Sequence, residues 1–538
     1  MNTKSIRYIL GWILNIEALL MLLPVGTAVF YREEEGVAYA LVMALCAAIG
    51  ALMTYKKPKN PNFYAKEGFV CTAMGWIAMS IFGCLPFMLT GEIPSFVDAM
   101  FEMVSGFTTT GASVVENVEM LSHCTNMWRC FSHWIGGMGI LVFLLAVLPL
   151  VGGSNMQLMK AESPGPSVGK LVPKVRFTAR ILYYLYVALT VLQVVVMLLG
   201  GMTLYEALCT SFGTAGTGGF GIRSDSIASF SPFLQWAITI FMIAFGVNFN
   251  DYFLIYMRKP KEALKCEEMR WYLAIIVSAA LLIFVNAYDV SLTIEHNLRQ
   301  SFFQVASIIT TTGFATADFN LWHGFSRGIL VLLMFIGACA GSTGGGLKVS
   351  RIVIGFKSVM AYLGAFLHPR AVRKVKFEDK DVDSETMHAI CVYFIAAIGL
   401  FVISVLLVSL DGFDLVSTFT AVAATFNNIG PGLGMAGPSS NFAAFSDFSK
   451  IVLTMDMLLG RLEVFPMLLL FYPPLWKESI EEARIRRNRA ARLSRYADSG
   501  LMQAEANASR RKTFLYSSSG GKSRFPRSFF ALHRYNEL

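Results

Sequence analysis

The sequence predicts an all-α polytopic membrane protein made of four helix–re-entrant hairpin–helix repeats with pseudo-fourfold symmetry, preceded by an N-terminal helix pair. Of its 538 residues, 55% are hydrophobic and 15% are charged, whereas about 25% of a typical soluble domain is charged. Apolar stretches long enough to cross about 30 Å of hydrocarbon recur along the chain. Four glycines, each ending a short amphipathic segment between two long apolar ones, recur at intervals of similar length.

The apolar stretches number about ten, and each is a candidate membrane-spanning helix. The first one lacks a small-residue cleavage pattern and is too long for the core of a signal peptide, so it is kept as a membrane helix. The stretches cover residues 8–30, 38–53, 69–89, 128–151, 179–201, 233–256, 271–287, 328–355, 388–410 and 451–475.

The charged residues of the connecting loops indicate the orientation of the chain. The loop after the first stretch carries three glutamates at 33–35, whereas the loop after the second carries four lysines between residues 56 and 66. Later loops expected on that second side are basic again. This alternation follows the positive-inside rule and puts both termini in the cytoplasm. The formal net charge of +9 therefore reflects membrane orientation, and no nucleic-acid partner is expected.

The chain divides into an N-terminal helix pair, four repeats and a tail. The pair covers residues 1–60, the repeats cover 66–155, 175–260, 268–365 and 385–477, and the basic tail covers 480–538. In each repeat a short segment lies between the two long helices, at 96–107, 204–212, 298–309 and 413–426. These segments are too short to span a membrane, which favours re-entrant hairpins. The tail is expected to be partly disordered, as a cationic arm near anionic lipid or as a docking site for a cytosolic partner.

Four glycines follow the short segments: Gly111, Gly218, Gly313 and Gly430. They stand in TTTGAS, AGTGGF, TTTGFA and NNIGPG, and they are 107, 95 and 117 residues apart. Glycine permits backbone conformations that a Cβ would obstruct. Four such segments around one axis would direct their carbonyl oxygens at a common point, which is how a potassium filter replaces the water shell of the ion. Taken singly, each motif could equally end an ordinary turn or helix.

The residue before the glycine carries a hydroxyl in three of the four segments, and threonine hydroxyls can add a further ring of oxygens to a filter. The candidate filter residues for potassium are Thr109, Thr110, Gly111, Thr217, Gly218, Thr311, Thr312, Gly313, Asn428, Ile429 and Gly430.

A run of small residues, GACAGSTGGG at 337–346, interrupts the second long helix of the third repeat. Each glycine costs about 1 kcal/mol relative to alanine in a helix interior, so the run disfavours a continuous helix. We interpret residues 337–347 as a gating loop beneath the filter; close helix packing through small residues is the alternative. A phosphate-binding loop is rejected because the glycine, lysine and hydroxyl residues do not follow in the required order. The candidate gate residues are Gly341, Ser342, Thr343, Gly344, Gly345, Gly346 and Arg461.

Arg461 lies near the middle of the last apolar stretch. A charged side chain there costs about 2.5 kcal/mol or more, so it is expected to face the protein interior and to have a partner. The partner could be Glu463 or Asp456, in a structural ion pair. The other interpretation is that Arg461 lies against the gating loop, where its positive charge would oppose the passage of cations.

With these motifs the chain resembles the Trk/Ktr/HKT superfamily of potassium uptake proteins, and most of all its TrkH type, over about residues 1–480. The resemblance is carried by TTTGAS, AGTGGF, TTTGFA, NNIGPGLG and GACAGSTGGGLKVSR. It implies a pseudo-fourfold pore, a homodimer and a cytosolic, nucleotide-binding (TrkA-like) regulatory subunit. Plant relatives that favour sodium have serine in place of the first filter glycine, so Gly111 favours potassium.

The expected function is potassium uptake across the cell inner membrane through a channel-like pore, whether passive or coupled to another ion. No cofactor is expected in this chain, and the nucleotide is expected on the regulatory partner. The alternative is a secondary cation-coupled solute transporter, although such proteins commonly have two inverted repeats. An enzyme is not expected, because the sequence contains no recognisable nucleophile–base set.

Cys124 and Cys130 could form a disulfide or could be small apolar fillers.

Overall fold

The computed structural model of the chain describes residues 3–58, 65–139, 175–368 and 374–476. The predicted tail at 480–538 and the part of the first repeat after residue 139 lie outside these ranges. The chain divides into a large unit, Met1–Phe471, and a second unit, Tyr472–Leu538, of which the description includes one short helix, α22 (Pro473–Trp476). All that follows concerns the large unit.

The helices of the large unit follow the order expected from the sequence. The N-terminal part contains α1 (Thr3–Leu20), α2 (Leu22–Tyr31) and α3 (Gly36–Thr54). The first repeat contains α4 (Ala65–Thr90), α5 (Phe96–Phe107) and α6 (His123–Met138). The second contains α9 (Val175–Leu199), α10 (Leu204–Ala215), α11 (Pro232–Phe245), α12 (Phe249–Tyr256) and α13 (Pro260–Lys265). The third contains α14 (Glu267–Asn286), α15 (Ile294–Ile309), α16 (Gly324–Met334) and α17 (Val349–Leu367). The fourth contains α18 (Ser384–Val408), α19 (Leu415–Phe426), α20 (Asp447–Arg461) and α21 (Phe465–Leu470).

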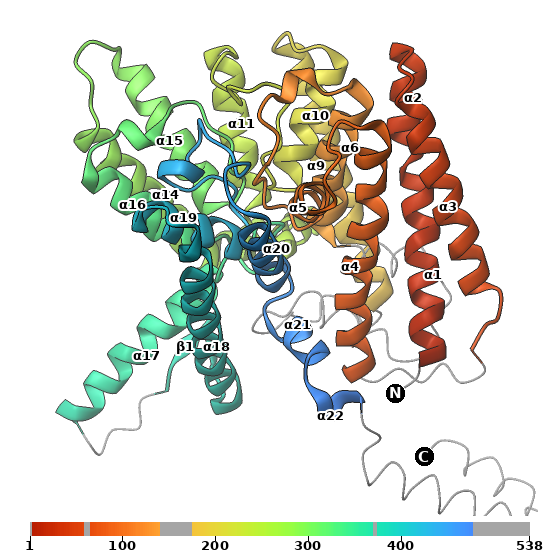
Figure 1. Cartoon of the computed structure of the whole chain (residues 1–538). Helices are drawn as coiled ribbons and strands as arrows, with labels where there is room; N and C mark the ends of the chain where they lie inside the picture. The colour runs from red at the N-terminus through yellow and green to blue at the C-terminus, as the bar shows by residue number, and fades with distance from the viewer. Residues whose placement is uncertain (1–2, 59–64, 140–174, 369–373, 477–538) are drawn as a thin grey trace, which may run out of the picture. The chain divides into compact units, whose positions relative to one another are not determined.

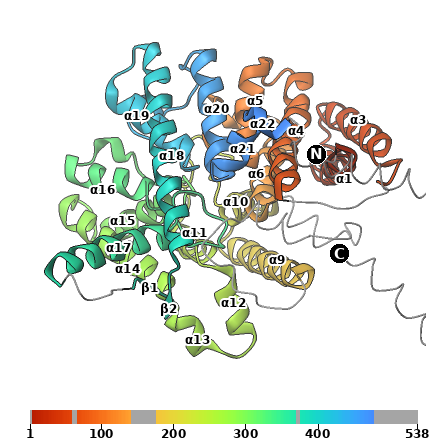
Figure 2. The same ribbon diagram turned by 90° about the horizontal axis from the view of Figure 1, so that it is seen from below.

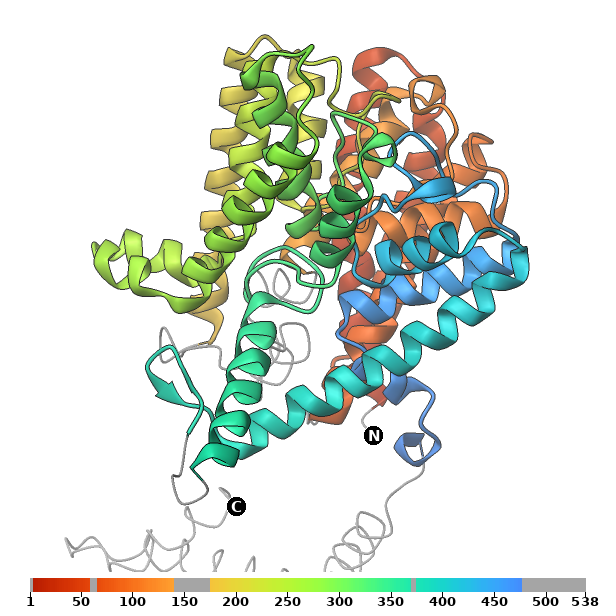
Figure 3. The same ribbon diagram turned by 90° about the vertical axis from the view of Figure 1, so that its left-hand side faces the viewer.

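Two short strands, β1 (Lys376–Phe377) and β2 (Lys380–Asp381), form an antiparallel hairpin between α17 and α18. Their register pairs Lys376 with Asp381 and Phe377 with Lys380. Figure 3 shows this hairpin at the same end of the unit as α12 and α13, below in that view. We call this the inner end.

The repeats are grouped in chain order around a common centre. Figure 2, a view from below, shows the α4–α6 group, the α9–α12 group, the α14–α17 group and the α18–α21 group in succession around that centre. The N-terminal helices α1 and α3 lie outside the ring, beside α4 (Figure 1). The arrangement accords with the predicted pseudo-fourfold organisation and with the predicted separate N-terminal helix pair.

In the described ranges, seven helices are long and apolar enough to cross a membrane, or eight if the bent pair α11–α12 is one span. The stretches 233–256 and 451–475 were expected to be continuous helices, and this is wrong for both. The first bends by 91° between α11 and α12, and the second is divided among α20, α21 and α22. The interruption of 328–355 between α16 and α17 was predicted and is confirmed.

Local chemistry explains the two unexpected breaks. At the first, the side chain of Asn248 accepts a hydrogen bond from the Asn250 amide and starts a new helix, α12. At the second, Glu463 and Val464 have φ values of 53° and 68°, in the left-handed region that ends a right-handed helix. Pro466 lies in the first turn of α21, where its missing amide hydrogen is not needed. Arg461 is therefore the last residue of α20 and not the middle of a continuous helix.

The four short helices predicted between the long ones are confirmed as α5, α10, α15 and α19. Each begins with a side-chain cap that accepts a backbone amide of the first turn. The capping residues are Ser95, Thr203, Thr293 and Asp414. Such caps satisfy amides that would otherwise lack a partner at the start of a helix. All four helices thus have defined starting points.

The N-terminal helices are attached to the first repeat at the outer end. The Glu33 carboxylate accepts hydrogen bonds from the amides of His123 at 2.7 Å and Cys124 at 2.9 Å. Partial burial acts to raise the pKa of Glu33, but these hydrogen bonds outweigh it and hold that pKa below its ordinary value. Cys124 and Cys130 are both buried free thiols on α6, so the second interpretation of this pair, as small fillers, is the one that holds.

Candidate functional site

The segments after the four short helices have the same backbone conformation. We call residues 109–111, 217–219, 311–313 and 428–430 strips 1 to 4. Each strip begins with a residue in the left-handed region, and its third residue is a glycine with positive φ. The φ values of the first residues are 56° for Thr109, 54° for Thr217, 60° for Thr311 and 56° for Asn428. Those of the glycines are 81° for Gly111, 81° for Gly219, 82° for Gly313 and 100° for Gly430.

This correspondence corrects the predicted alignment of the second strip. Gly219, and not Gly218, is the structural equivalent of Gly111, and Thr217 is the equivalent of Thr109 rather than of Thr110. Gly218 takes the middle position of its strip. The sequence AGTGGF offers two adjacent glycines, and only the backbone conformation distinguishes them.

The amide groups of the strips bond back to the short helix that precedes them. The first residue of each strip donates to the carbonyl three residues earlier, as from Thr109 to Gly106 at 3.1 Å, and the second donates to the carbonyl five residues earlier, as from Thr110 to Ser105 at 2.9 Å. The other three strips repeat both bonds, at 2.8–3.1 Å. This is the Schellman pattern of helix termination. Across the described ranges, none of the second- and third-position carbonyls of the four strips accepts a hydrogen bond.

The four strips approach one another in a closed ring. A Cβ added to Gly111 would lie 1.9 Å from the carbonyl oxygen of Gly218 in strip 2. A Cβ added to Gly219 would lie 2.0 Å from the Thr312 oxygen, and one added to Gly313 would lie 2.1 Å from the Ile429 oxygen. Strip 4 closes the ring, since a Cβ on Gly430 would lie 2.8 Å from the oxygen of Thr110 in strip 1. Side chains are thus excluded at the third positions, and each strip presents a carbonyl oxygen to the glycine of a neighbouring strip, which closes the ring.

The side chains of the strips bond to one another and to residues beside them. The hydroxyl of Thr110 lies 2.8 Å from that of Thr108 and accepts a hydrogen bond from the Asn428 amide group at 2.9 Å. In strip 3 the hydroxyl of Thr312 lies 2.7 Å from that of Thr310. Asn428 also donates to the Met457 carbonyl on α20 at 2.9 Å. These bonds join strip 4 to strip 1 and hold the ring closed at that junction.

A buried ion pair that was not predicted from the sequence supports the first strip. Arg129 on α6 donates to Glu102 on α5 from Nε at 2.8 Å and from Nη2 at 2.6 Å. The other oxygen of Glu102 accepts the Val114 amide at 2.9 Å. Charged residues inside apolar segments were the available signal, because such residues are costly in a membrane unless paired.

His133 joins the first and second strips and was also missed. Its Nδ1 lies 2.8 Å from the Gly106 carbonyl at the end of α5, and its Nε2 accepts the Phe220 amide at 3.1 Å. Because a carbonyl only accepts and an amide only donates, the ring is neutral with its proton on Nδ1. The imidazole therefore fixes the spacing between strip 1 and strip 2.

The gating loop lies directly against the strips. The amide of Gly345 donates to the Thr311 hydroxyl at 2.7 Å, and a Cβ on Gly344 would lie 3.0 Å from the Thr310 carbonyl oxygen. The hydroxyl of Thr343 donates to the Phe245 carbonyl at the end of α11. The remaining predicted gate residues, Gly341, Ser342 and Gly346, lie in the same loop, where Gly341 and Gly346 both have φ of 72°.

Arg461 donates to three carbonyl groups around the gating loop. Nη1 donates to the Thr343 oxygen at 2.9 Å, and Nη2 donates to the oxygens of Gly137, at 2.9 Å, and Gly136. The ion pairs considered from the sequence are formed differently: Glu463 pairs with Arg351, and Asp456 accepts the Ser404 hydroxyl at 2.6 Å. The contact between Arg461 and the gating loop is therefore confirmed.

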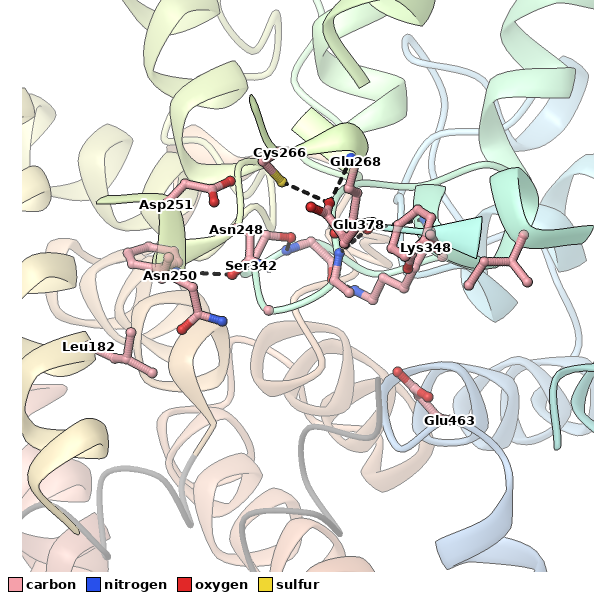
Figure 4. A pocket seen from close by; sticks show the side chains of 18 of the residues that line it. Leu182, Asn248, Asn250, Asp251, Cys266, Glu268, Ser342, Lys348, Glu378 and Glu463 are labelled. Carbon is pink, nitrogen blue, oxygen red and sulfur yellow. Dashed lines mark hydrogen bonds between the residues drawn. The ribbon is translucent and has the colours of Figure 1, made fainter. Parts of the chain in front are cut away.

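Beneath the gating loop is a cavity of about 660 Å³, open toward the inner end. Residues of all four repeats line it, among them Met138, Asp251, Ser342 and Glu463. Figure 4 shows this cavity, with Asp251 and Asn248 on one side and Glu463 on the other. We call it the inner vestibule.

Fold and site together define a multi-span membrane protein built to handle cations: unpaired carbonyl oxygens converge, a loop lies beneath them, and a vestibule follows. The comparisons agree with this class. The family model for TrkH, described as a cation transport protein, matches residues 36–480, and the chain belongs to this family.

The similarity to individual relatives covers nearly the whole chain. The Trk system potassium uptake protein TrkH of Salmonella typhimurium is 36% identical over 489 residues, which are 89% of this chain and 100% of the relative. TrkG of Escherichia coli K12, with the same coverage, is 33% identical over 487 residues. The crystal structure of the potassium transporter TrkH from Vibrio parahaemolyticus matches with a TM-score of 0.80 and 33% identity, over 89% of this chain and 100% of that one.

The corrected register of strip 2 can be tested with Gly219→Ala. The new methyl group would meet the Thr312 oxygen at 2.0 Å and would be strained at φ 81°, a conformation that costs roughly 1–3 kcal/mol without glycine. We expect rubidium uptake into proteoliposomes to fall by about tenfold or more, since 1.4 kcal/mol is one decade in rate.

Gly221→Ala is the matched control. Its methyl group would find no atom closer than 3.8 Å, so uptake should stay near the wild-type rate. A Gly219→Ala protein that is well folded and transports rubidium normally would contradict the ring as described.

Proposed function

We propose that this chain is the membrane subunit of a potassium uptake system and conducts the ion through the centre of its four repeats. The ring of carbonyl oxygens carries this proposal. Its amides are already bonded to the short helices, so its carbonyls are free to replace water around a dehydrated monovalent cation. The printed names of the relatives, Trk system potassium uptake proteins, support the same ion.

The strips favour potassium through their glycines. A glycine stands at the third position of every strip, Gly111 included, so no side chain enters the ring from these positions. The ends of α5, α10, α15 and α19 also direct their negative dipole ends toward the ring, which favours a cation there. A secondary cation-coupled solute transporter is less well supported, because a ring of backbone oxygens has no obvious use for a larger solute. We propose transport, and not catalysis, as the activity of the chain.

The chain would lie in the cell inner membrane with its inner end and both termini in the cytoplasm. The basic loops and the positive-inside rule support this orientation. An inward-negative potential then contributes about 2.3 kcal/mol per 100 mV to the uptake of each potassium ion. This driving force favours passive uptake, and coupling to a second ion would add to it.

The gating loop and Arg461 would control passage. The loop contacts strip 3 from the inner side, and the guanidinium of Arg461 holds it through Thr343 while also bonding to α6. Its positive charge opposes a cation leaving the ring. Opening would require the loop to move away and Arg461 to release at least the Thr343 carbonyl.

A cytosolic, TrkA-like nucleotide-binding subunit is the proposed regulator, with the nucleotide on that subunit and none on this chain. A route from the inner surface to the gating loop supports the idea. Glu378 of the β hairpin accepts the amides of Glu267 at 2.9 Å and Glu268 at 3.2 Å at the start of α14. Glu268 in turn accepts the amides of Ala340, within the gating loop, at 2.7 Å and of Ser350, at the start of α17, at 3.1 Å. A partner that pulls on the hairpin would thus act on the loop.

Family resemblance also supports a homodimer.

Ion selectivity tests the proposed filter. Rubidium uptake into proteoliposomes should be inhibited by potassium at concentrations roughly tenfold below those needed for sodium or lithium, a difference of about 1.4 kcal/mol in binding. Gly313→Ser should lower this discrimination, because its side chain would start 2.1 Å from the Ile429 oxygen. Gly324→Ser, where a side chain meets open space, should change nothing. If sodium inhibited the wild type at the same concentrations as potassium, the ring would not select potassium over sodium.

The role of Arg461 is tested by the flux of the closed protein. Arg461→Ala should raise rubidium leak several-fold in proteoliposomes without any regulator, because the loop loses its hydrogen bond and the pore loses a positive charge. Arg461→Lys keeps the charge but cannot bridge three carbonyls, so its leak should be intermediate. A folded Arg461→Ala protein that leaks no more than the wild type would end the proposal of a gate held by this residue.

Regulation through the hairpin is tested with Glu378→Gln. Loss of the charge weakens two amide bonds at the start of α14, each worth about 1.5–3 kcal/mol when made to a charged group. We expect stimulation of uptake by an added TrkA-like subunit to fall by at least half, while binding of that subunit persists. Asp379→Asn changes the same charge at the neighbouring exposed position and should leave stimulation intact. Equal effects of the two variants would speak against the route through Glu378.

A further inference from the structure

The inner vestibule is rich in acidic side chains, and most of them are already engaged. Eight carboxylates and four cationic side chains line it. Glu463 pairs with Arg351, while Glu268 and Glu378 accept backbone amides. These groups hold the protein together around the vestibule, so they are not free to bind a solute ion strongly.

Asp251 on α12 differs from these carboxylates. Its side chain lines the vestibule, yet the residue is only 5% exposed. One of its oxygens, Oδ2, is buried and has no hydrogen-bond partner among the residues that the structure describes. The thiol of Cys266 lies beside both Asp251 and Glu378 and donates to Glu378 at 3.2 Å. A buried carboxylate oxygen without a partner is costly, and a bound cation would offset that cost.

The surroundings of Asp251 suit a small cation. Asp251 lies in the first turn of α12, where the helix dipole favours its ionised form. Asn248, three residues earlier, caps α12 by accepting the Asn250 amide at 2.9 Å, and it lines the same vestibule as Asp251. Asn248 also faces the gating loop: a Cβ added to Gly341 would lie 2.9 Å from the Asn248 side-chain oxygen, its nearest neighbour. Oxygen ligands from a carboxylate, an amide and nearby carbonyls are those that hard cations prefer.

We propose that Asp251 and Asn248 form a binding site for a monovalent alkali cation in the inner vestibule, directly after the gating loop. The inference rests on the proposed function, since the cation is the one that has passed the ring. One carboxylate with neutral oxygens matches a single positive charge, whereas a divalent ion requires more charge or more ordered water. The site gives a cation that leaves the ring a second resting position before the cytosol.

Thallium(I), a heavy substitute for potassium, tests the site directly. Crystals of the full chain grown in a thallium salt should give anomalous density between the four strips and again beside the Asp251 carboxylate. Asp251→Asn should lose the second peak and keep the first. Density between the strips with none at Asp251 in the wild type would overturn this inference and leave the proposed function intact. Absence of density between the strips would instead count against the proposed filter.

Flux provides the second readout. In proteoliposomes, Asp251→Asn should raise the half-saturating rubidium concentration on the inner side roughly fivefold, because one charge close to the ion is lost, and it should leave the outer value unchanged. Asp379→Asn removes an exposed carboxylate from the same vestibule and should shift the inner value much less. Equal shifts in the two variants would reduce the effect to general surface charge and would contradict a specific site.

Discussion

The central constraint on this structure is that backbone amides and carbonyls inside a membrane need polar partners. The strips meet it unevenly. The amides of their first and second residues bond back to the ends of α5, α10, α15 and α19, while the carbonyls of their second and third residues are left without a protein partner in the described ranges. The left-handed residue that starts each strip separates the two sets of groups, because it reverses the chain at the end of a helix. A cation that has lost its water is the partner that such carbonyls lack.

The same constraint explains why the helices beneath the ring are broken. A break exposes carbonyls at membrane depth, and the structure satisfies several of them with a few polar side chains. Arg461 alone donates to the oxygens of Gly136, Gly137 and Thr343, and Glu268 accepts one amide within the gating loop and one just after it. These contacts come from individual side chains and not from a helical hydrogen-bond ladder, so the broken region suits a movable barrier. A continuous helix would satisfy its own backbone and could not open in this way.

The repeats are equivalent in their backbone and not in their side chains. Strip 1 is supported by the Glu102–Arg129 ion pair, whereas beside strip 3 the Ser307 hydroxyl donates to the Phe314 carbonyl at 2.5 Å. In the fourth repeat the Thr420 hydroxyl accepts the Leu433 amide at 2.8 Å. Different side chains thus stabilise the strips, which have no regular secondary structure, in each repeat. For this reason the repeats are hard to align by residue identity alone.

Elements that depend on local composition and spacing could be predicted from the sequence. Apolar length predicted the spanning helices, the glycines marked the ends of the short ones, and the run at 337–346 predicted a break, because each of these signals acts over one or two helical turns. The register of strip 2, the breaks at Asn248 and Val464, and the partner of Arg461 could be read only from the tertiary structure. The sequence does not distinguish Gly218 from Gly219, but only Gly219 has a left-handed backbone and lies against the Thr312 carbonyl. Such choices arise where segments about one hundred residues apart meet, and no local pattern encodes a contact of that range.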